Sequence, residues 1–108
     1  MTEYRVAAEA DVNALGAAIA GALADNPAAP VSLQCIGPRS VNNGVKAVAA
    51  AKHMMMSDGW KIQLVMIPRF LTKLLRGQEV TAMELLVRLE QITGDEDQTD
   101  RQPDVSPA

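Results

Sequence analysis

The stretch from Ile36 to Ala51 constrains the fold of this chain more than any other. Its sequence is IGPRSVNNGVKAVAAA, in which an apolar segment reaches a Gly-Pro turn and a helix-forming segment follows. Ser40 is placed to cap this helix by accepting hydrogen bonds from first-turn amides, while Val41, Val45 and Val48 share one apolar face. Because the first exposed groups are polar and basic, we expect this loop to meet a partner.

Strand and helix patterns alternate along the first 68 residues. Residues 4–8 and 31–35 alternate in polarity and predict short strands, and Asp11 is placed to cap a helix that runs to about Asp25. The second helix is predicted from about Val41 to Met56, and residues 60–67 predict a third strand. Pro68 lacks an amide donor, so that strand should bulge, bend or lie at an edge there.

Residues 71–92 fit two patterns. Alternation typical of a strand involves Met83, Leu85, Val87 and Leu89. A helical face is formed by Ala82, Leu85, Leu86 and Leu89, and Thr81 with Glu84 fits a capping box. The residue pattern alone leans slightly towards a helix.

The helix entry, with its I-G…N-x-x-V-K-A-V-A motif, and the later Ile67-Pro68 pair resemble the stage V sporulation protein S family over most of residues 1–92. This resemblance implies an α/β fold of the Alba type, a β-α-β-α-β-β two-layer sandwich with two helices on a four-stranded mixed sheet. It makes residues 80–92 a strand. It also makes Arg76-Gly77-Gln78-Glu79 the turn of a long hairpin.

One domain, residues 1–92, is followed by an acidic tail. Residues 93–108 contain five acidic residues and two prolines without apolar periodicity, so we expect them to be disordered. The chain has a net charge of −3, but the charges are segregated. Residues 36–78 contain seven basic residues against Asp58 alone, whereas the tail carries a balance of −4.

The basic middle predicts contacts with nucleic-acid phosphates rather than with base edges. The candidate residues lie in the loop and second helix and along the expected hairpin: Arg39, Ser40, Asn42, Asn43, Lys46, His53, Arg69, Lys73 and Arg76. The family resemblance implies Arg39 and Lys46 for a first site and Lys73 and Arg76 for a second. An ordinary solvated helix face is the alternative interpretation.

Catalytic and metal chemistry find little support in this sequence. Cys35 ends an apolar strand, where a buried inert thiol is the favoured interpretation, and no third residue orients His53 as its base. One His and one Cys give no metal-ligand spacing, and no cofactor is expected. The lone cysteine and the absence of an apolar span favour a cytoplasmic protein that does not contact a membrane.

Both predicted helices carry uncharged small residues away from their apolar stripes. In the first helix these are Ala14, Ala17, Ala18 and Gly21, and in the second Ala47, Ala50 and Ala51. They suit either packing of the two helices on each other or contact with another copy. The sequence thus predicts a non-enzymatic regulator that binds DNA or RNA as a homodimer or larger homo-oligomer. The alternative is a protein-interaction or self-assembly module that binds no nucleic acid.

Overall fold

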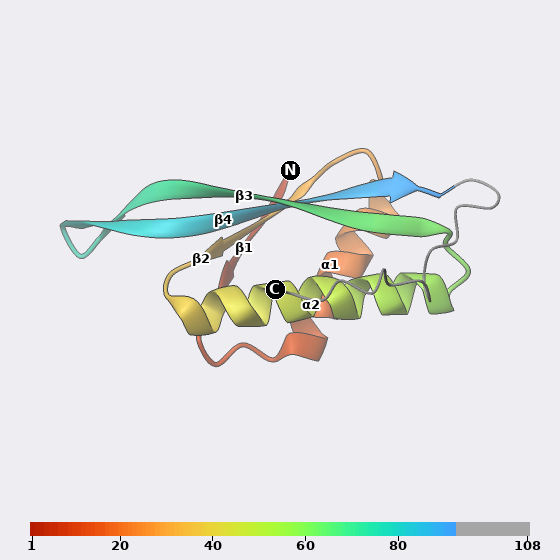
Figure 1. Ribbon diagram of the computed structural model, residues 1–108, viewed down its shortest axis with the longest axis horizontal. Helices are drawn as coiled ribbons and strands as arrows, with labels where there is room; N and C mark the ends of the chain where they lie inside the picture. The colour runs from red at the N-terminus through yellow and green to blue at the C-terminus, as the bar shows by residue number, and fades with distance from the viewer. Residues whose placement is uncertain (93–108) are drawn as a thin grey trace, which may run out of the picture.

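The computed structural model describes residues 1–92, and the predicted acidic tail, residues 93–108, lies outside them. Six elements follow one another along the chain (Figure 1). They are strand β1 (Thr2–Val6), helix α1 (Val12–Asp25), strand β2 (Val31–Cys35), helix α2 (Pro38–Ser57), strand β3 (Ile62–Leu75) and strand β4 (Gln78–Gln91). The expected β-α-β-α-β-β order is confirmed.

The four strands form one mixed sheet in the order β1-β2-β4-β3. β1 runs parallel to β2, and β4 is antiparallel to both of its neighbours, β2 and β3. β1 and β3 are therefore the edge strands. Pro68 lies within β3, opposite Leu85 of β4, so the expectation that its strand would lie at an edge is confirmed.

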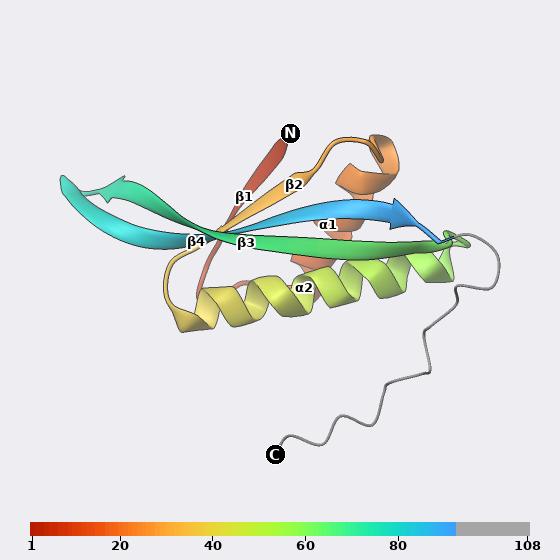
Figure 2. The same cartoon turned by 45° about the horizontal axis from the view of Figure 1, so that its top comes forward.

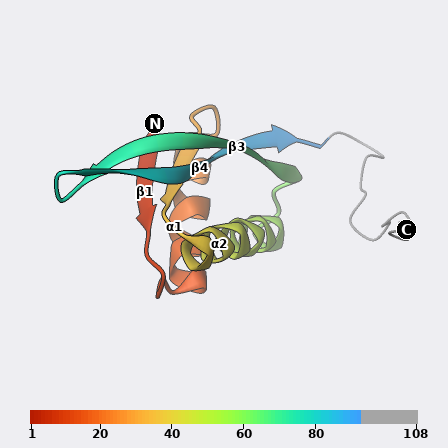
Figure 3. The ribbon, with the colours of Figure 1, turned by 60° about the vertical axis from the view of Figure 1, so that its left-hand side comes forward.

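Both helices cover the same face of the sheet and leave the other face without a helix (Figures 2 and 3). The core lies between these two layers. Its residues without measurable exposure are Ile19, Leu23, Leu33, Cys35, Ala47, Ala51 and Val87. The expected helix from Asp11 is confirmed, because the Asp11 carboxylate accepts from the amides of Asn13 and Ala14 at 3.0 and 3.1 Å.

The two helices approach each other closely at Gly16. A Cβ atom at that position would lie 2.9 Å from the Cβ of Ala50 and 3.1 Å from the carbonyl oxygen of Ala47. Ala47 and Ala51 are fully buried. The small residues of α2 therefore serve packing within the chain. On α1, by contrast, Ala17 and Gly21 remain exposed.

The second helix begins three residues earlier than predicted. Pro38 is its first residue, and Gly37, whose φ is +87°, is the N-cap without a side-chain cap. The prediction that Ser40 caps the helix is wrong. Its hydroxyl instead donates to the carbonyl oxygens of Ile36 at 2.8 Å and Gly37 at 3.1 Å. Val45 also differs from the predicted apolar face, because it is exposed.

β3 and β4 form a hairpin that outgrows the sheet. β2 ends at Cys35, opposite Met83, so residues 71–82 continue as a two-stranded ribbon, here called the arm, which projects from one end of the molecule (Figure 1). Arg76 and Gly77 form its turn, with φ values of +52° and +80°. The predicted turn was two residues too long, since Gln78 and Glu79 belong to β4.

Residues 78–91 are a strand, so the interpretation from family resemblance is confirmed and the leaning of the residue pattern towards helix is wrong. β4 is flanked by strands on both sides, and both of its faces carry buried side chains. Such a strand loses the clean alternation of a half-buried one. Neither helix among residues 1–92 is long and apolar enough to cross a membrane.

Candidate nucleic-acid interface

Helix α2 presents a polar stripe to solvent. Its buried face is formed by Ser40, Gly44, Ala47, Val48, Ala51 and Met55. Asn42, Lys46 and His53 lie away from that face and are exposed, as the helical spacing predicts. With Arg39 in the first turn, they give one side of α2 two permanent cations and two hydrogen-bonding side chains.

Arg39 stands beside an acidic neighbour. Its Nη1 atom lies 3.7 Å from Oε1 of Glu9, in the loop between β1 and α1, and both side chains are about three-quarters exposed, at 72% and 77%. An exposed ion pair of this length contributes little to stability. Glu9 lowers the net positive charge around Arg39. Because the pair is weak, a phosphate group can displace Glu9.

Two predicted contact residues instead hold the fold together. The Nδ2 atom of Asn43 donates to the carbonyl oxygen of Ala8 at 2.9 Å, which ties α2 to the loop after β1. Ser40 is only 1% exposed and hydrogen bonds to the turn that precedes its own helix. Both side chains are therefore engaged in contacts within the fold.

The first turn of α2 offers backbone donors. Gly37 has no side chain to cap the helix, and Pro38 has no amide hydrogen. The amides of Arg39 and Ser40 thus lie at the positive end of the helix dipole without a side-chain acceptor from the cap. An anion near Arg39 gains from both the guanidinium and this helix end.

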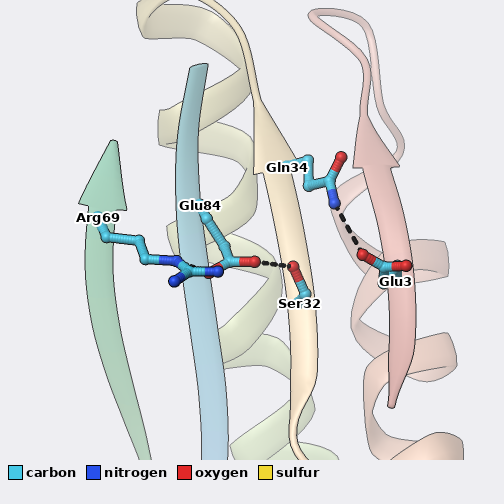
Figure 4. Close-up of polar contacts among 5 residues, drawn as sticks. All are labelled: Glu3, Ser32, Gln34, Arg69 and Glu84. Atoms are coloured by element: carbon cyan, nitrogen blue, oxygen red, sulfur yellow. Dashed lines mark hydrogen bonds and ion pairs between the residues drawn. The ribbon is translucent and has the colours of Figure 1, made fainter. Parts of the chain in front are cut away.

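The uncovered face of the sheet carries a polar belt across all four strands (Figure 4). Glu84 of β4 accepts a hydrogen bond from the Ser32 hydroxyl of β2 at 2.7 Å, and its other oxygen binds the Nε atom of Arg69 of β3. Gln34 of β2 donates to Glu3 of β1 at 3.0 Å. Glu84 is only 4% exposed although no helix covers it.

Glu84 removes Arg69 from the set of free cations. The bond from Ser32, and then the bond and charge of Arg69, hold the pKa of the Glu84 carboxyl below its ordinary value, although burial acts in the opposite direction. The carboxylate is therefore ionised at neutral pH and neutralises Arg69. The prediction that Arg69 contacts nucleic acid gains no support from this geometry.

Lys73 lies half-buried along a groove between β1 and the arm. It shares the groove with Arg5 and Gln34, and the part that reaches the arm has a volume of about 350 Å³. Its floor is apolar and includes Val6, Ile36, Leu75 and Ala82. Arg5 was missed by the sequence analysis, although the alternation of the first strand already pointed it away from the core.

The structure thus forms two basic clusters from the predicted residues. Arg39 and Lys46 lie in the N-terminal half of α2, and Lys73 and Arg76 belong to the arm. The N-terminal end of α2 lies at the end of the molecule from which the arm projects (Figures 1 and 3).

Cys35 does not belong to either cluster. It is fully buried in β2, and burial raises the pKa of its thiol, an effect that the hydrogen bond with Ser40 only partly offsets. His53 is exposed on α2. The interpretation of Cys35 as a buried thiol is confirmed. Among residues 1–92, no group of three or more His, Cys, Asp and Glu side chains is arranged to hold a metal ion.

Comparison with known proteins gives two results. The family model of stage V sporulation protein S matches residues 2–90 of the chain. The solved structure of Alba from Thermoplasma volcanium superposes with a TM-score of 0.56 at 11% sequence identity, covering 83% of this chain and 100% of that one. At 11% identity, the match to Alba shows similarity of the fold alone.

Proposed function

Because the chain belongs to the stage V sporulation protein S family, a sporulation-related family of regulators, we propose that it is a non-enzymatic regulator that binds nucleic-acid phosphates. The single observation that carries this proposal is the segregation of charge. Seven basic residues and one acidic residue occupy residues 36–78 of an otherwise acidic chain. Four of the basic residues form the two clusters at one end of the fold.

Binding to the backbone fits the side chains of these clusters. Arg39, Lys46, Lys73 and Arg76 are long cations at exposed or half-exposed positions, which suits contacts with phosphate oxygens. We therefore expect little sequence preference. DNA and RNA are both compatible with these contacts, and we place the protein in the cytoplasm as a homodimer or larger homo-oligomer.

A double variant tests the first cluster. R39A/K46A should weaken binding to unrelated probes to a similar degree. Because each lost phosphate contact removes about 0.9 from the slope of log K against log salt on duplex DNA, the slope should fall by about two. Fluorescence anisotropy with single- and double-stranded probes at several salt concentrations measures both quantities.

The matched control is K52A/K61A, which changes the net charge by the same amount outside the clusters. Its salt slope should stay close to that of the unmodified protein. An unchanged slope in folded R39A/K46A would remove this cluster from the proposal. Absence of salt-sensitive binding in the unmodified protein would instead favour the alternative, a protein-interaction or self-assembly module.

A further inference from the structure

The outer edge of β3 in the arm offers backbone groups to a new strand. Ile92 donates its amide to the carbonyl oxygen of Lys61 at 3.0 Å, and the pairing of β3 with β4 continues from there without a break. The backbone N–H and C=O groups of odd-numbered residues in β3 therefore point towards β4, and those of even-numbered residues point towards the free edge. Between Pro68 and the turn, the edge-facing residues are Phe70, Thr72 and Leu74.

This edge is apolar and exposed. Phe70 and Leu74 are 75% and 73% exposed, and Thr72 between them is also exposed. Within residues 1–92 no strand pairs with this edge, because β3 is the last strand of the sheet. A two-stranded ribbon without further cover is marginally stable in water. An added strand would cover its backbone groups and its apolar side chains together.

We propose that two copies of the chain pair through this edge, with β3 antiparallel to β3 about a twofold axis at Thr72. The two arms then form one four-stranded ribbon. The β3 edge would then be the surface of the self-association proposed above, and this pairing requires no nucleic acid. The second copy is the occupant because the edge is complementary to itself in both hydrogen bonding and charge.

The hydrogen bonding selects one register. With the axis at Thr72, Phe70 lies opposite the partner's Leu74, and Thr72 lies opposite the partner's Thr72. All three edge-facing residues then pair, and each such pair exchanges two backbone hydrogen bonds. A shift towards Pro68 loses bonds because proline has no amide hydrogen, and a shift towards Arg76 runs into the turn.

The charges select the same register. On the opposite face of the ribbon, Lys73 would lie opposite the partner's Leu71, and Arg69 opposite the partner's Leu75. An axis at Leu71 would place Lys73 against the partner's Arg69, and an axis at Lys73 would place the two Lys73 side chains together. Like charges directly opposite each other destabilise a strand pair. The axis at Thr72 avoids both arrangements, and axes further towards Pro68 or Arg76 are excluded by the lost hydrogen bonds.

Pairing also brings basic residues together. The twofold axis is perpendicular to the ribbon, so Lys73 of both copies lies on the same face. The dimer thus offers a nucleic-acid backbone the cations of two arms.

The first test replaces Thr72 by proline. Thr72 faces the free edge, so T72P removes no hydrogen bond to β4, in the same way that Pro68 is accommodated in this strand. The unmodified protein should sediment at twice the 11.5 kDa of one chain. T72P should sediment as a monomer, with the dissociation constant raised at least tenfold. The control T72A keeps the backbone donor and should remain dimeric.

A dimeric T72P, or an unmodified protein that is monomeric at 100 μM, overturns the proposal. A second experiment tests the pairing even if T72P does not fold. Three variants, L71C, T72C and K73C, are oxidised under native conditions, and Cys35 remains in place because it is fully buried. In the proposed register the two Thr72 Cα atoms lie about 5.5 Å apart, within disulfide range.

T72C should therefore form covalent dimers at least tenfold faster than L71C and K73C. Equal rates in the three variants, or fastest formation by L71C or K73C, contradict the proposed pairing. Both experiments omit nucleic acid. A negative result in these experiments would not contradict phosphate binding. Absence of phosphate binding would likewise not contradict the pairing.

Discussion

Glu84 is a carboxylate withdrawn from solvent on the face of the sheet that no helix covers. Burial of a charge is costly unless partners compensate, and here Ser32 and Arg69 each satisfy one oxygen. The two partners come from strands on either side of β4. The three residues therefore fasten β2, β4 and β3 together at the root of the arm, where the four-stranded sheet narrows to two strands.

Acid should weaken this arrangement. The pKa of Glu84 is lower in the folded protein than its ordinary value, so its contribution to stability is fully present above the unfolded-state pKa of about 4.3. That contribution is lost as the pH falls through the lower, folded-state pKa. E84Q should lower the free energy of unfolding at pH 7 by about 1–3 kcal/mol, since it replaces the charge-assisted bonds of the carboxylate by neutral ones.

Urea unfolding at several pH values measures this effect. The difference between the unmodified protein and E84Q should shrink as the pH falls through the folded-state pKa of Glu84. E79Q, at an exposed position on the same strand, is the matched control and should unfold like the unmodified protein. A difference between E84Q and the unmodified protein that stays constant from pH 7 to pH 3 would contradict this role of the carboxylate.

At the scale of elements, the contact between α1 and α2 depends on one missing side chain. G16A would push a Cβ atom into Ala50 and towards the backbone of Ala47, and the backbone cannot easily give way. We expect the free energy of unfolding to fall by about 1–3 kcal/mol. G21A lies on the same helix with nothing within 4 Å and should gain up to about 1 kcal/mol from helix propensity. Equal stabilities in urea would show that the helices can separate without cost.

Local signals predicted the elements that local chemistry determines. Asp11 caps α1 as expected, and alternation located β1 and β2. The prediction of Ser40 as a helix cap was wrong because Pro38 is itself a favoured first residue of a helix, so α2 begins before the serine. β4 was ambiguous because its neighbours on both sides bury both of its faces, which is a property of the sheet and not of the segment.

The candidate site was predictable to a similar degree. Exposure of Asn42, Lys46 and His53 follows from helical spacing. The roles of Asn43 and Arg69 depend on partners far away in the sequence: Asn43 binds Ala8, 35 residues away, and Arg69 binds a carboxylate that Ser32 also holds, 52 residues before it. No local pattern reports such contacts. Of the nine predicted contact residues, we therefore base the proposal on Arg39, Lys46, Lys73 and Arg76.

For the whole molecule, the decisive quantity is the opposition between a basic middle and an acidic tail. Residues 93–108 carry −4, and their removal changes the net charge from −3 to +1. Truncation after Ile92 should raise nucleic-acid affinity at low salt, because repulsion between the tail and the phosphates is lost. The gain should disappear near physiological salt, where the screening length is about 8 Å.

A second variant separates the charge of the tail from its length. It replaces the five tail acids, Asp95, Glu96, Asp97, Asp100 and Asp104, by Asn or Gln and keeps all 108 residues. If charge is the cause, this variant, which keeps Arg101 and has a net charge of +2, should gain at least as much affinity as the truncated chain in the same anisotropy assay. If only truncation raises the affinity, the tail acts by occupying space. If neither change does, the tail has no electrostatic role in nucleic-acid binding.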